Sequence, residues 1–251
     1  MITSTVRTSR NGRSSFPYLF LIMGVFCYFW IAVPLLAQPV TPDAVESFLP
    51  GEGGGRGKEY LPWNVLGLPD STAREEVPTI DPAQVLSLGL EGEIILRFDQ
   101  VVIVDGPGVD FTIFENAFRY TIGGKEKIYA EPGEVAVSQD GFEFFPFPFD
   151  SLSLKGCAGV TPTHGDADPR DPALSGGDGF DLAEIGVDSI RFIRIRDVTG
   201  IVKKNSSHPF YDPTVNGFDL DAVVAVNLLE NEFMSGVEIA GDDQGKELDL
   251  R

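Results

Sequence analysis

The chain has 251 residues, of which 43% are hydrophobic and 19 are Phe, so it is long and apolar enough to form one large folded domain. It carries 38 acidic against 19 basic residues, a formal net charge of −19. A field of this sign repels phosphate backbones and attracts cations, which argues against nucleic acid as a partner. The acidic surplus can also serve only to keep an extracellular protein soluble.

The N-terminus has the pattern of a secretory signal peptide over residues 1–37. Basic residues up to Arg13 precede an apolar run at 16–36. Leu35 departs from the small residue preferred near a cleavage point, and the run approaches the roughly 20 residues that span a bilayer. A retained membrane anchor is therefore the alternative, and the only membrane contact expected. The sequence predicts a secreted or cell-surface protein.

Composition divides the remainder into three parts. Residues 38–58 are rich in Pro, Gly and Glu and predict a flexible lead-in. A single domain is expected over 59–228, interrupted by an acidic loop insertion at 150–186 where the strand pattern lapses. The acidic segment 229–251 has little apolar periodicity and is expected to be a tail.

Short apolar runs separated by Gly, Pro and Asp predict strands, and few helices are indicated. A slip in the alternation at Phe192–Ile193 suggests a β-bulge. Many short strands at close spacing indicate an all-β fold, a β-sandwich or jelly roll. The expected strands lie at 85–90, 93–98, 101–104, 110–115, 134–138, 189–197 and 218–226.

Aromatic residues gather in the run 142–149, where Pro146 and Pro148 forbid a central strand and favour a sheet edge. Its phenylalanines are expected to pack in the core and protect that edge, with a sugar-stacking surface as the alternative. Trp63 lies among apolar neighbours and is likewise expected in the core, again with sugar stacking as the alternative.

The motif Gly-Phe-Asp-Leu occurs twice, at 179–182 and 217–220. The first copy belongs to a glycine-rich acidic run, which predicts a ligand-binding loop containing Asp178, Phe180 and Asp181. The second copy opens a strand. Period two places Asp219 and Asp221 on one face, where they repel unless a cation lies between them.

Another acidic position stands at the end of the run 110–115. Its apolar face ends in Glu115, which suits a metal ligand or a buried polar network, whereas a strand-end glutamate facing water is the simpler alternative. Calcium prefers six to eight oxygen ligands, which Asp and Glu supply.

Two segments carry a family resemblance. Residues 135–144, Val-Ala-Val-Ser-Gln-Asp-Gly-Phe-Glu-Phe, and 190–196, Ile-Arg-Phe-Ile-Arg-Ile-Arg, resemble the discoidin-like domains of galactose-binding-like jelly-roll fold. More broadly, 60–227 resembles a poorly characterised group of bacterial and archaeal secreted cell-surface proteins, through the motifs at 85–89, 106–117 and 217–223. The resemblance implies a calcium ion held by an early loop and the last strand, and thus by Asp70 with Asp219 or Asp221.

The function expected from these features is a calcium-stabilised, secreted binding module whose partner is a glycan or another cell-surface component. A structural cell-surface protein without a small ligand is one alternative. A carbohydrate hydrolase using two of Asp110, Glu115 and Asp181 as acid and base is another. His164 and His208 are the only histidines, which leaves little material for a zinc site or a catalytic triad. No enzyme is predicted, and the expected calcium ligands are Asp70, Asp110, Glu115, Asp219 and Asp221.

Overall fold

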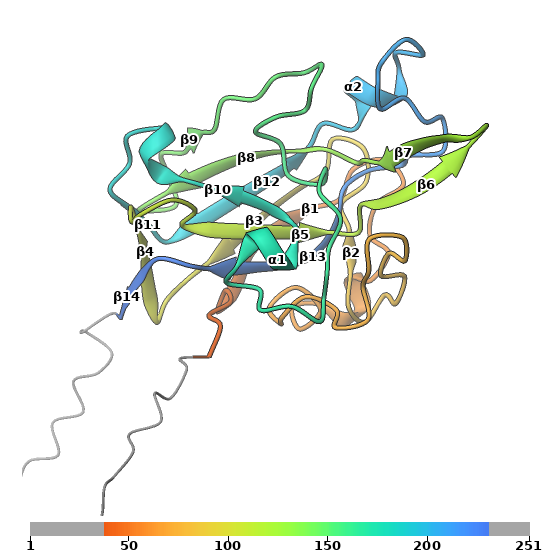
Figure 1. Ribbon diagram of the computed structural model, residues 1–251. Coiled ribbons are helices and arrows are strands. Elements are labelled where there is room, and N and C mark those ends of the chain that lie inside the picture. The colour runs from red at the N-terminus through yellow and green to blue at the C-terminus, as the bar shows by residue number, and fades with distance from the viewer. Residues whose placement is uncertain (1–37, 231–251) are drawn as a thin grey trace, which may run out of the picture. The chain divides into compact units, whose positions relative to one another are not determined.

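The computed structural model describes residues 38–230, a part of the chain built almost entirely of antiparallel β-strands (Figure 1). The expected signal peptide and most of the expected tail lie outside the described residues. Within 38–230 no helix has both the length and the hydropathy needed to cross a bilayer. The helical turns of this part are η1 (Lys58–Tyr60), α1 (Pro172–Ser175), η2 (Leu182–Glu184) and α2 (Gly200–Lys203).

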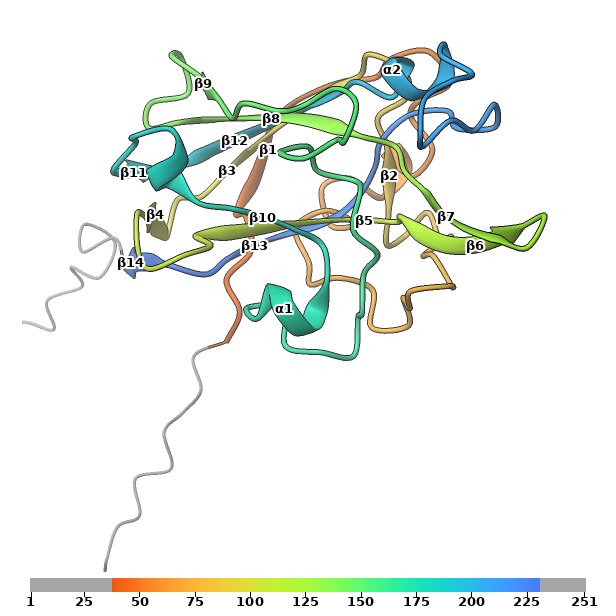
Figure 2. The ribbon, with the colours of Figure 1, turned by 45° about the horizontal axis from the view of Figure 1, so that its top comes forward.

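Two sheets form the layers of a sandwich, as the view in Figure 2 shows. The five-stranded sheet has the order β1 (Ala44–Leu49), β3 (Glu93–Arg97), β12 (Phe192–Asp197), β8 (Gly133–Ser138) and β9 (Phe145–Pro146). The four-stranded sheet has the order β10 (Asp178–Phe180), β5 (Phe111–Glu115), β13 (Asp219–Ala225) and β2 (Leu86–Ser87). The predicted all-β sandwich is confirmed.

Smaller sheets extend this framework. β11 (Ser189–Ile190), β4 (Val101–Val104) and β14 (Leu228–Glu230) form a three-stranded sheet, in which β4 lies between the other two. β6 (Phe118–Ile122) and β7 (Lys125–Tyr129) form a hairpin that projects from the end of β5 (Figure 1). The two glycines between its strands, Gly123 and Gly124, both have positive φ, as a two-residue hairpin turn requires.

The core lies between the two larger sheets because their strands alternate apolar residues inward. Ile94 and Leu96 of β3 meet Ile193 and Ile195 of β12 on one layer, and Phe111 of β5 lies on the other. The Phe111 ring stacks on Phe180 at 5.2 Å between centroids and meets the edge of Phe147 at 6.0 Å. This aromatic cluster joins β5 and β10 to the segment that follows β9.

The prediction of a flexible lead-in over residues 38–58 is wrong. Residues 44–49 form β1, which pairs with β3 along its whole length, apart from a register shift between Val45 and Ser47. Ala44, Val45, Phe48 and Leu49 supply an apolar face that the Pro and Gly content of the neighbouring segments obscured. The folded domain thus begins well before residue 59.

The irregularity expected near Phe192 is a change of partner instead of a bulge. β11 pairs with β4, and after Arg191 the chain continues as β12 between β3 and β8, in register with both. The acidic insertion at 150–186 also contains a strand, because β10 joins the edge of the four-stranded sheet beside β5. The long loop is therefore tied into the sandwich at its end.

The proline-rich aromatic run lies at a sheet edge, as expected, since β9 is the last strand of the five-stranded sheet. Core packing is wrong for Phe142, which is 90% exposed, and for Phe145, which is also exposed. Phe147 is buried. Alternation on an edge strand turns Phe145 outward and Phe147 inward, and Phe142 lies in the turn that precedes the strand.

Phe111→Ala is expected to lower the free energy of unfolding by about 3–5 kcal/mol, because it empties a closed aromatic cluster. Phe142→Ala is the matched control, and a change within about 0.5 kcal/mol is expected for this exposed ring. Urea unfolding followed by circular dichroism measures both. Equal losses in the two variants would contradict the described core.

Candidate functional site

The five predicted calcium ligands do not converge on one point. The structure divides them into three separate groups, and a β-bulge explains part of the division. The register between β13 and β5 shifts between Leu220 and Ala222, so Asp221 has no direct partner in β5. Period two therefore does not carry from Asp219 to Asp221, and the two carboxylates have different neighbours. The groups are Asp70 with Asp221, Asp110 with Asp105 and Asp181, and Glu115 with Asp219.

The early loop does meet the last long strand, through Asp70 and Asp221. The Asp70 amide donates to both carboxylate oxygens of Asp221, at 3.2 and 3.0 Å. The Asp70 carboxylate accepts hydrogen bonds from Thr72 and from the Thr79 hydroxyl. Burial and the charge of Asp70 raise the pKa of Asp221 to about 7. All four oxygens of this pair have donors, so the contact is satisfied by the protein itself.

The second group places carboxylate oxygens of Asp105, Asp110 and Asp181 within 4.8 Å of one another. Asp110 is fully buried and accepts from the amides of Gly106 and Leu182, at 2.8 and 2.7 Å, and from the Asn227 side chain. Asp181 caps η2 by accepting from the Ala183 amide. Desolvation and the charges of Asp110 and Asp181 raise the pKa of Asp105. The three acids could hold an ion, but the buried member already has a donor for each oxygen.

The third group is buried and incompletely bonded. Glu115, at the end of β5, is 1% exposed; its Oε1 accepts from the Asp219 amide at 3.2 Å, whereas its Oε2 has no hydrogen-bond partner. Asp219, at the start of β13, is 8% exposed, and its Oδ2 accepts from the Asn116 amide group at 3.2 Å. Ser87 pairs with Asp219 across β2 and β13, and a hydrogen bond between their side chains partly offsets the rise that burial causes in the pKa of Asp219.

A further acid adds charge to this group. Glu131 is buried and accepts from the amides of Asn216 and Gly217. Burial and the charge of Asp219 raise the pKa of Glu131 to about 8. Burial, together with the charges of Glu131 and Asp219, raises the pKa of Glu115 well above its usual range. The structure therefore gathers acidic side chains whose charged forms are disfavoured where β13 begins.

The second Gly-Phe-Asp-Leu motif sets this geometry. Gly217 has a φ of +123°, and a Cβ there would lie 2.4 Å from the carbonyl carbon of Gly89. Only glycine fits this close approach. Phe218 then enters the core and Asp219 pairs with Ser87. The motif was recognised in the sequence, but its close contact with Gly89 was not.

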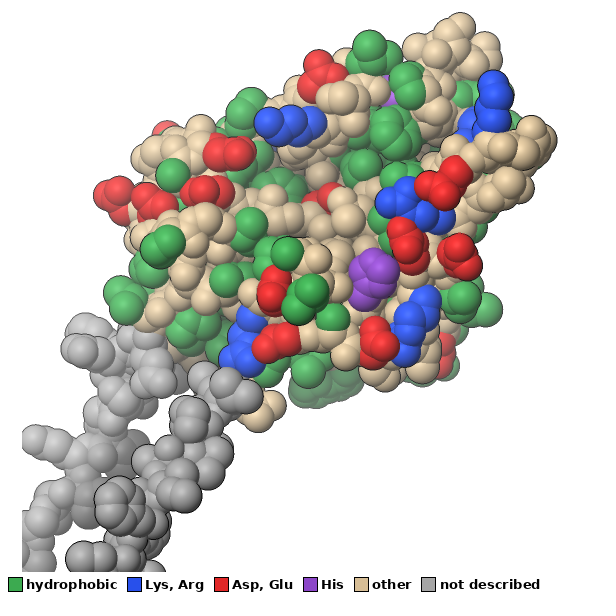
Figure 3. Space-filling model, in the orientation of Figure 1, with side chains coloured by type: hydrophobic (Ala, Val, Ile, Leu, Met, Phe, Trp, Pro, Cys, Tyr) green, Lys and Arg blue, Asp and Glu red, His purple; other side chains and the backbone are tan. Residues whose placement is uncertain are grey.

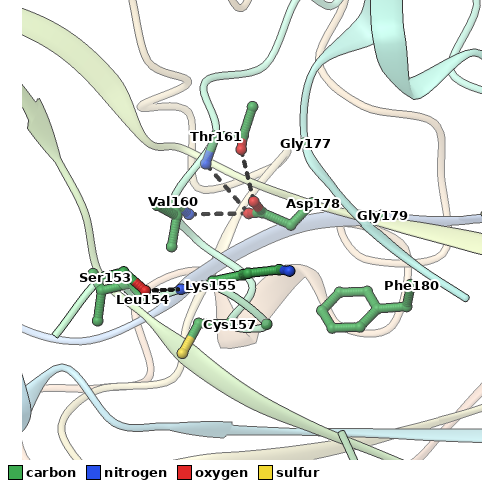
Figure 4. Close-up of a pocket in the computed structure, with 11 residues that line it drawn as sticks. Ser153, Leu154, Lys155, Cys157, Val160, Thr161, Gly177, Asp178, Gly179 and Phe180 are labelled. Atoms are coloured by element: carbon green, nitrogen blue, oxygen red, sulfur yellow. Dashed lines mark hydrogen bonds between the residues drawn. The ribbon is translucent and has the colours of Figure 1, made fainter. Parts of the chain in front are cut away.

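The predicted ligand-binding residues are not assembled into one site. Asp178 and Phe180 border a pocket of about 270 Å³, which Lys155 and Cys157 also line (Figure 4). The Asp178 carboxylate turns toward Val160 and Thr161, whose amides and hydroxyl donate to it. Asp181 lies with Asp105 and Asp110 instead.

Two of the lining side chains have little to offer a ligand. Phe180 is buried against Phe111 and Phe147. Burial raises the pKa of the Cys157 thiol to about 12, which leaves little of the thiolate nucleophile at neutral pH. The polar groups that remain for a ligand come chiefly from Lys155 and Ser153.

Trp63 lies on the surface, and its predicted position in the core is wrong. The side chain is 80% exposed, and Tyr60, three residues earlier, is also exposed. The loop beneath it is well anchored: the buried Asn64 side chain donates to the carbonyls of Gly57, Pro82 and Val85. Val65 is fully buried. Inward-facing Asn64 and Val65 leave Trp63 outside, a division that the apolar composition of the segment concealed.

Two of the three hydrolase candidates, Asp110 and Glu115, are poorly placed for catalysis. Asp110 and Glu115 are both buried and bonded to main-chain amides, and they belong to different groups. A glycosidase needs two carboxyl groups that flank a sugar bond. Neither of these acids is exposed to a bound sugar. His208 is also buried, with its Nε2 2.8 Å from the Ser151 carbonyl oxygen.

Comparison with known proteins identifies no family. No protein-family model matches the chain, and no curated protein matches it. Among solved structures, a pectin-binding carbohydrate-binding module is similar over 74% of this chain and 91% of its own, with 14% sequence identity and a TM-score of 0.35. At this level the likeness carries no information about ligand or metal.

Asp178 gives a pH prediction. Burial raises its pKa to about 6, so the folded state keeps a proton that the unfolded state, with a pKa near 3.8, releases. Its contribution to stability is complete below about pH 4 and is lost as the pH rises through about 6, with an upper limit of about 3 kcal/mol. Asp178→Asn keeps an acceptor for the Val160 amide and removes the charge. The variant is expected to lose less stability than the wild type between pH 4 and 7 in urea unfolding. Parallel pH curves would contradict the shift.

Proposed function

We propose that this chain is a secreted or cell-surface, calcium-stabilised β-sandwich binding module whose ligand is a glycan, and that it is not an enzyme. The export part rests on the signal-peptide pattern of residues 1–37. The lone buried Cys157 leaves the mature domain without an internal disulfide, so stability depends on the core and on polar bonds.

The glycan part of the proposal rests on the exposure of the Trp63 side chain. An indole that is 80% exposed on a loop fixed by buried Asn64 and Val65 forms a flat, preordered apolar surface. Trp suits contacts in which one face is apolar and the edge is wet, and a sugar ring offers an apolar face with hydroxyls around it. Preorganisation lowers the entropic cost of binding. Tyr60 adds a second exposed ring with a hydroxyl.

The calcium part rests on donor chemistry. All three acidic groups present only oxygen ligands, which suit a hard cation such as Ca²⁺. Carboxylates buried close together without basic partners are stabilised by such an ion. In residues 38–230 none of the salt bridges involves Glu115, Glu131 or Asp219.

The test of the glycan proposal is binding of the wild type and Trp63→Ala to a diverse glycan array, with affinities for any hit measured by calorimetry. Trp63→Ala is expected to weaken binding at least tenfold, or by about 1.4 kcal/mol, because it removes the stacking surface. Its melting temperature is expected to stay close to that of the wild type, since the ring contributes little to the core.

Two variants serve as controls. Phe142→Ala removes another exposed ring and is expected to leave binding unchanged. Lys155→Ala alters the pocket beside Asp178, and a loss confined to this variant would move the ligand to that pocket. Failure of the wild type to bind any glycan would overturn the glycan proposal and favour a structural cell-surface protein.

A further inference from the structure

We infer that a small pocket between residues 68–71 and 164–169 binds one neutral sugar ring of the glycan, beside the part that stacks on Trp63. The pocket has a volume of about 170 Å³, and His164 and Ser71 are among the residues that line it. The inference deepens the glycan part of the proposed function, on which it rests, and is independent of the calcium part.

The two walls of this pocket are held together by main-chain contacts. A Cβ on Gly165 would lie 1.8 Å from the Asp70 carbonyl oxygen, so the two segments touch directly. The Gly165 amide donates to the Ala73 carbonyl at 3.0 Å, and the His164 amide donates to the Ser175 carbonyl at 2.7 Å. The second bond ties the same segment to the end of α1. The pocket is therefore formed without a ligand, which lowers the entropic cost of binding.

The His164 side chain gives the pocket a polar group that the fold leaves unused. The ring is partly exposed, and within residues 38–230 neither of its nitrogens has a hydrogen-bond or salt-bridge partner. One edge of the ring faces Gly176, where an added Cβ would lie 3.2 Å from the His164 Cδ2. His208, in contrast, is buried and bonded to a carbonyl. A neutral imidazole offers one donor and one acceptor, so His164 can bond two hydroxyls of a ligand.

The remaining lining is mostly apolar. Leu68, Pro69, Ala167 and Pro169 supply hydrocarbon surface, and the exposed Ser71 adds a hydroxyl. Ligand sites combine apolar walls with a few polar groups in this way, and those for drug-sized molecules have volumes of about 300–1,000 Å³. A pocket smaller than that suits a single ring. A sugar ring presents C–H faces to apolar walls and hydroxyls to the imidazole.

The charges around the pocket favour a neutral sugar over an acidic one. Neither Lys nor Arg lines the pocket, whereas Asp166 and Asp168 stand in the 164–169 wall. Arg74 pairs with Asp166 at 3.3 Å, and Arg170 pairs with Asp168 at 2.7 Å. These arginines are therefore engaged by acids and are poorly placed to bind a carboxylate or sulfate. A uronic acid would also meet the negative field of the chain, whose net charge is −19.

The pocket lies next to the Trp63 loop. A Cβ on Gly67 would lie 3.8 Å from the Trp63 carbonyl oxygen, so the chain folds back on itself there. Leu68 follows directly and begins the pocket wall, and standard backbone dimensions put its Cα no more than about 9 Å from that oxygen. Neighbouring residues of one glycan chain can therefore contact the exposed Trp63 ring and the pocket together.

The test measures the binding of single-ring probes to the full-length protein by saturation-transfer NMR titration. The neutral probes are the methyl glycosides of glucose, galactose, mannose, xylose and N-acetylglucosamine, and the acidic probes are glucuronic and galacturonic acid. The wild type is expected to bind at least one neutral probe and to bind the acidic probes more weakly. His164→Ala is expected to weaken the neutral probe by about fivefold or more, because it removes hydrogen bonds to the sugar.

A matched pair of leucine variants locates the effect. Leu68→Ala removes part of the pocket wall and is expected to weaken the same probe. Leu174→Ala alters an exposed leucine of α1 that does not line the pocket, and is expected to leave the probe's Kd unchanged. Melting temperatures close to that of the wild type are expected for all three variants, since each side chain is exposed or partly exposed. Leu68→Ala remains as the test if His164→Ala does not fold.

The outcomes separate the pocket from the glycan function. A wild type that binds a longer glycan on the array but none of the neutral probes would overturn the pocket alone. Probe binding that survives both His164→Ala and Leu68→Ala but is lost in Trp63→Ala would do the same. Equal affinity for the acidic probes would overturn the choice of a neutral sugar. A wild type that binds neither array glycans nor probes would overturn the glycan function together with the pocket.

Discussion

Hydrogen bonds from main-chain amides to buried carboxylates hold this protein's loops to its sandwich. Asp197, at the end of β12, accepts from the amides of Glu91, Thr199 and Phe218, which come from three segments of the chain. Asp110 similarly joins the turn after β4 to the start of η2. A charged acceptor makes these bonds stronger than neutral ones, and the low dielectric of the interior adds to the effect. In a domain whose one described cysteine is free, such bonds take the place of covalent cross-links.

These buried carboxylates change how the acidic composition of the chain is interpreted. An excess of carboxylates is expected to coat the surface, and Figure 3 does show acidic side chains spread over one face, several beside Lys or Arg. Yet Asp110, Glu115, Glu131, Asp197, Asp219 and Asp221 are all buried. Burial of each carries a desolvation cost that hydrogen-bond donors, protonation or a cation can offset. Glu115 stands apart because its Oε2 has no hydrogen-bond partner among residues 38–230.

The sequence predicted what depends on local pattern and missed what depends on pairing. Strands such as β4 and β5 follow from short runs of apolar residues, and the proline-rich edge follows from the missing amide donors. The bulge at Asp221 depends on the register between β13 and β5, which lie more than 100 residues apart in the chain. Period two was therefore misleading at this point. The predicted core position of Trp63 was wrong for a related reason. Asn64 turns inward because its side chain donates to the carbonyls of Pro82 and Val85, which lie in a later segment of the chain.

The exposed ring of Trp63 and the buried acids of β13 are linked through one loop. The loop that displays Trp63 continues to Asp70, whose amide is bonded to Asp221 in β13, two residues beyond Asp219. Anything that orders the start of β13 therefore also supports the far end of that loop. The pocket beside Asp178 belongs to β10, at the opposite edge of the same sheet from β2. An ordered β13 thus stabilises the Trp63 loop directly, whereas it reaches the Asp178 pocket only through β5. The two candidate ligand surfaces therefore differ in how closely they depend on β13.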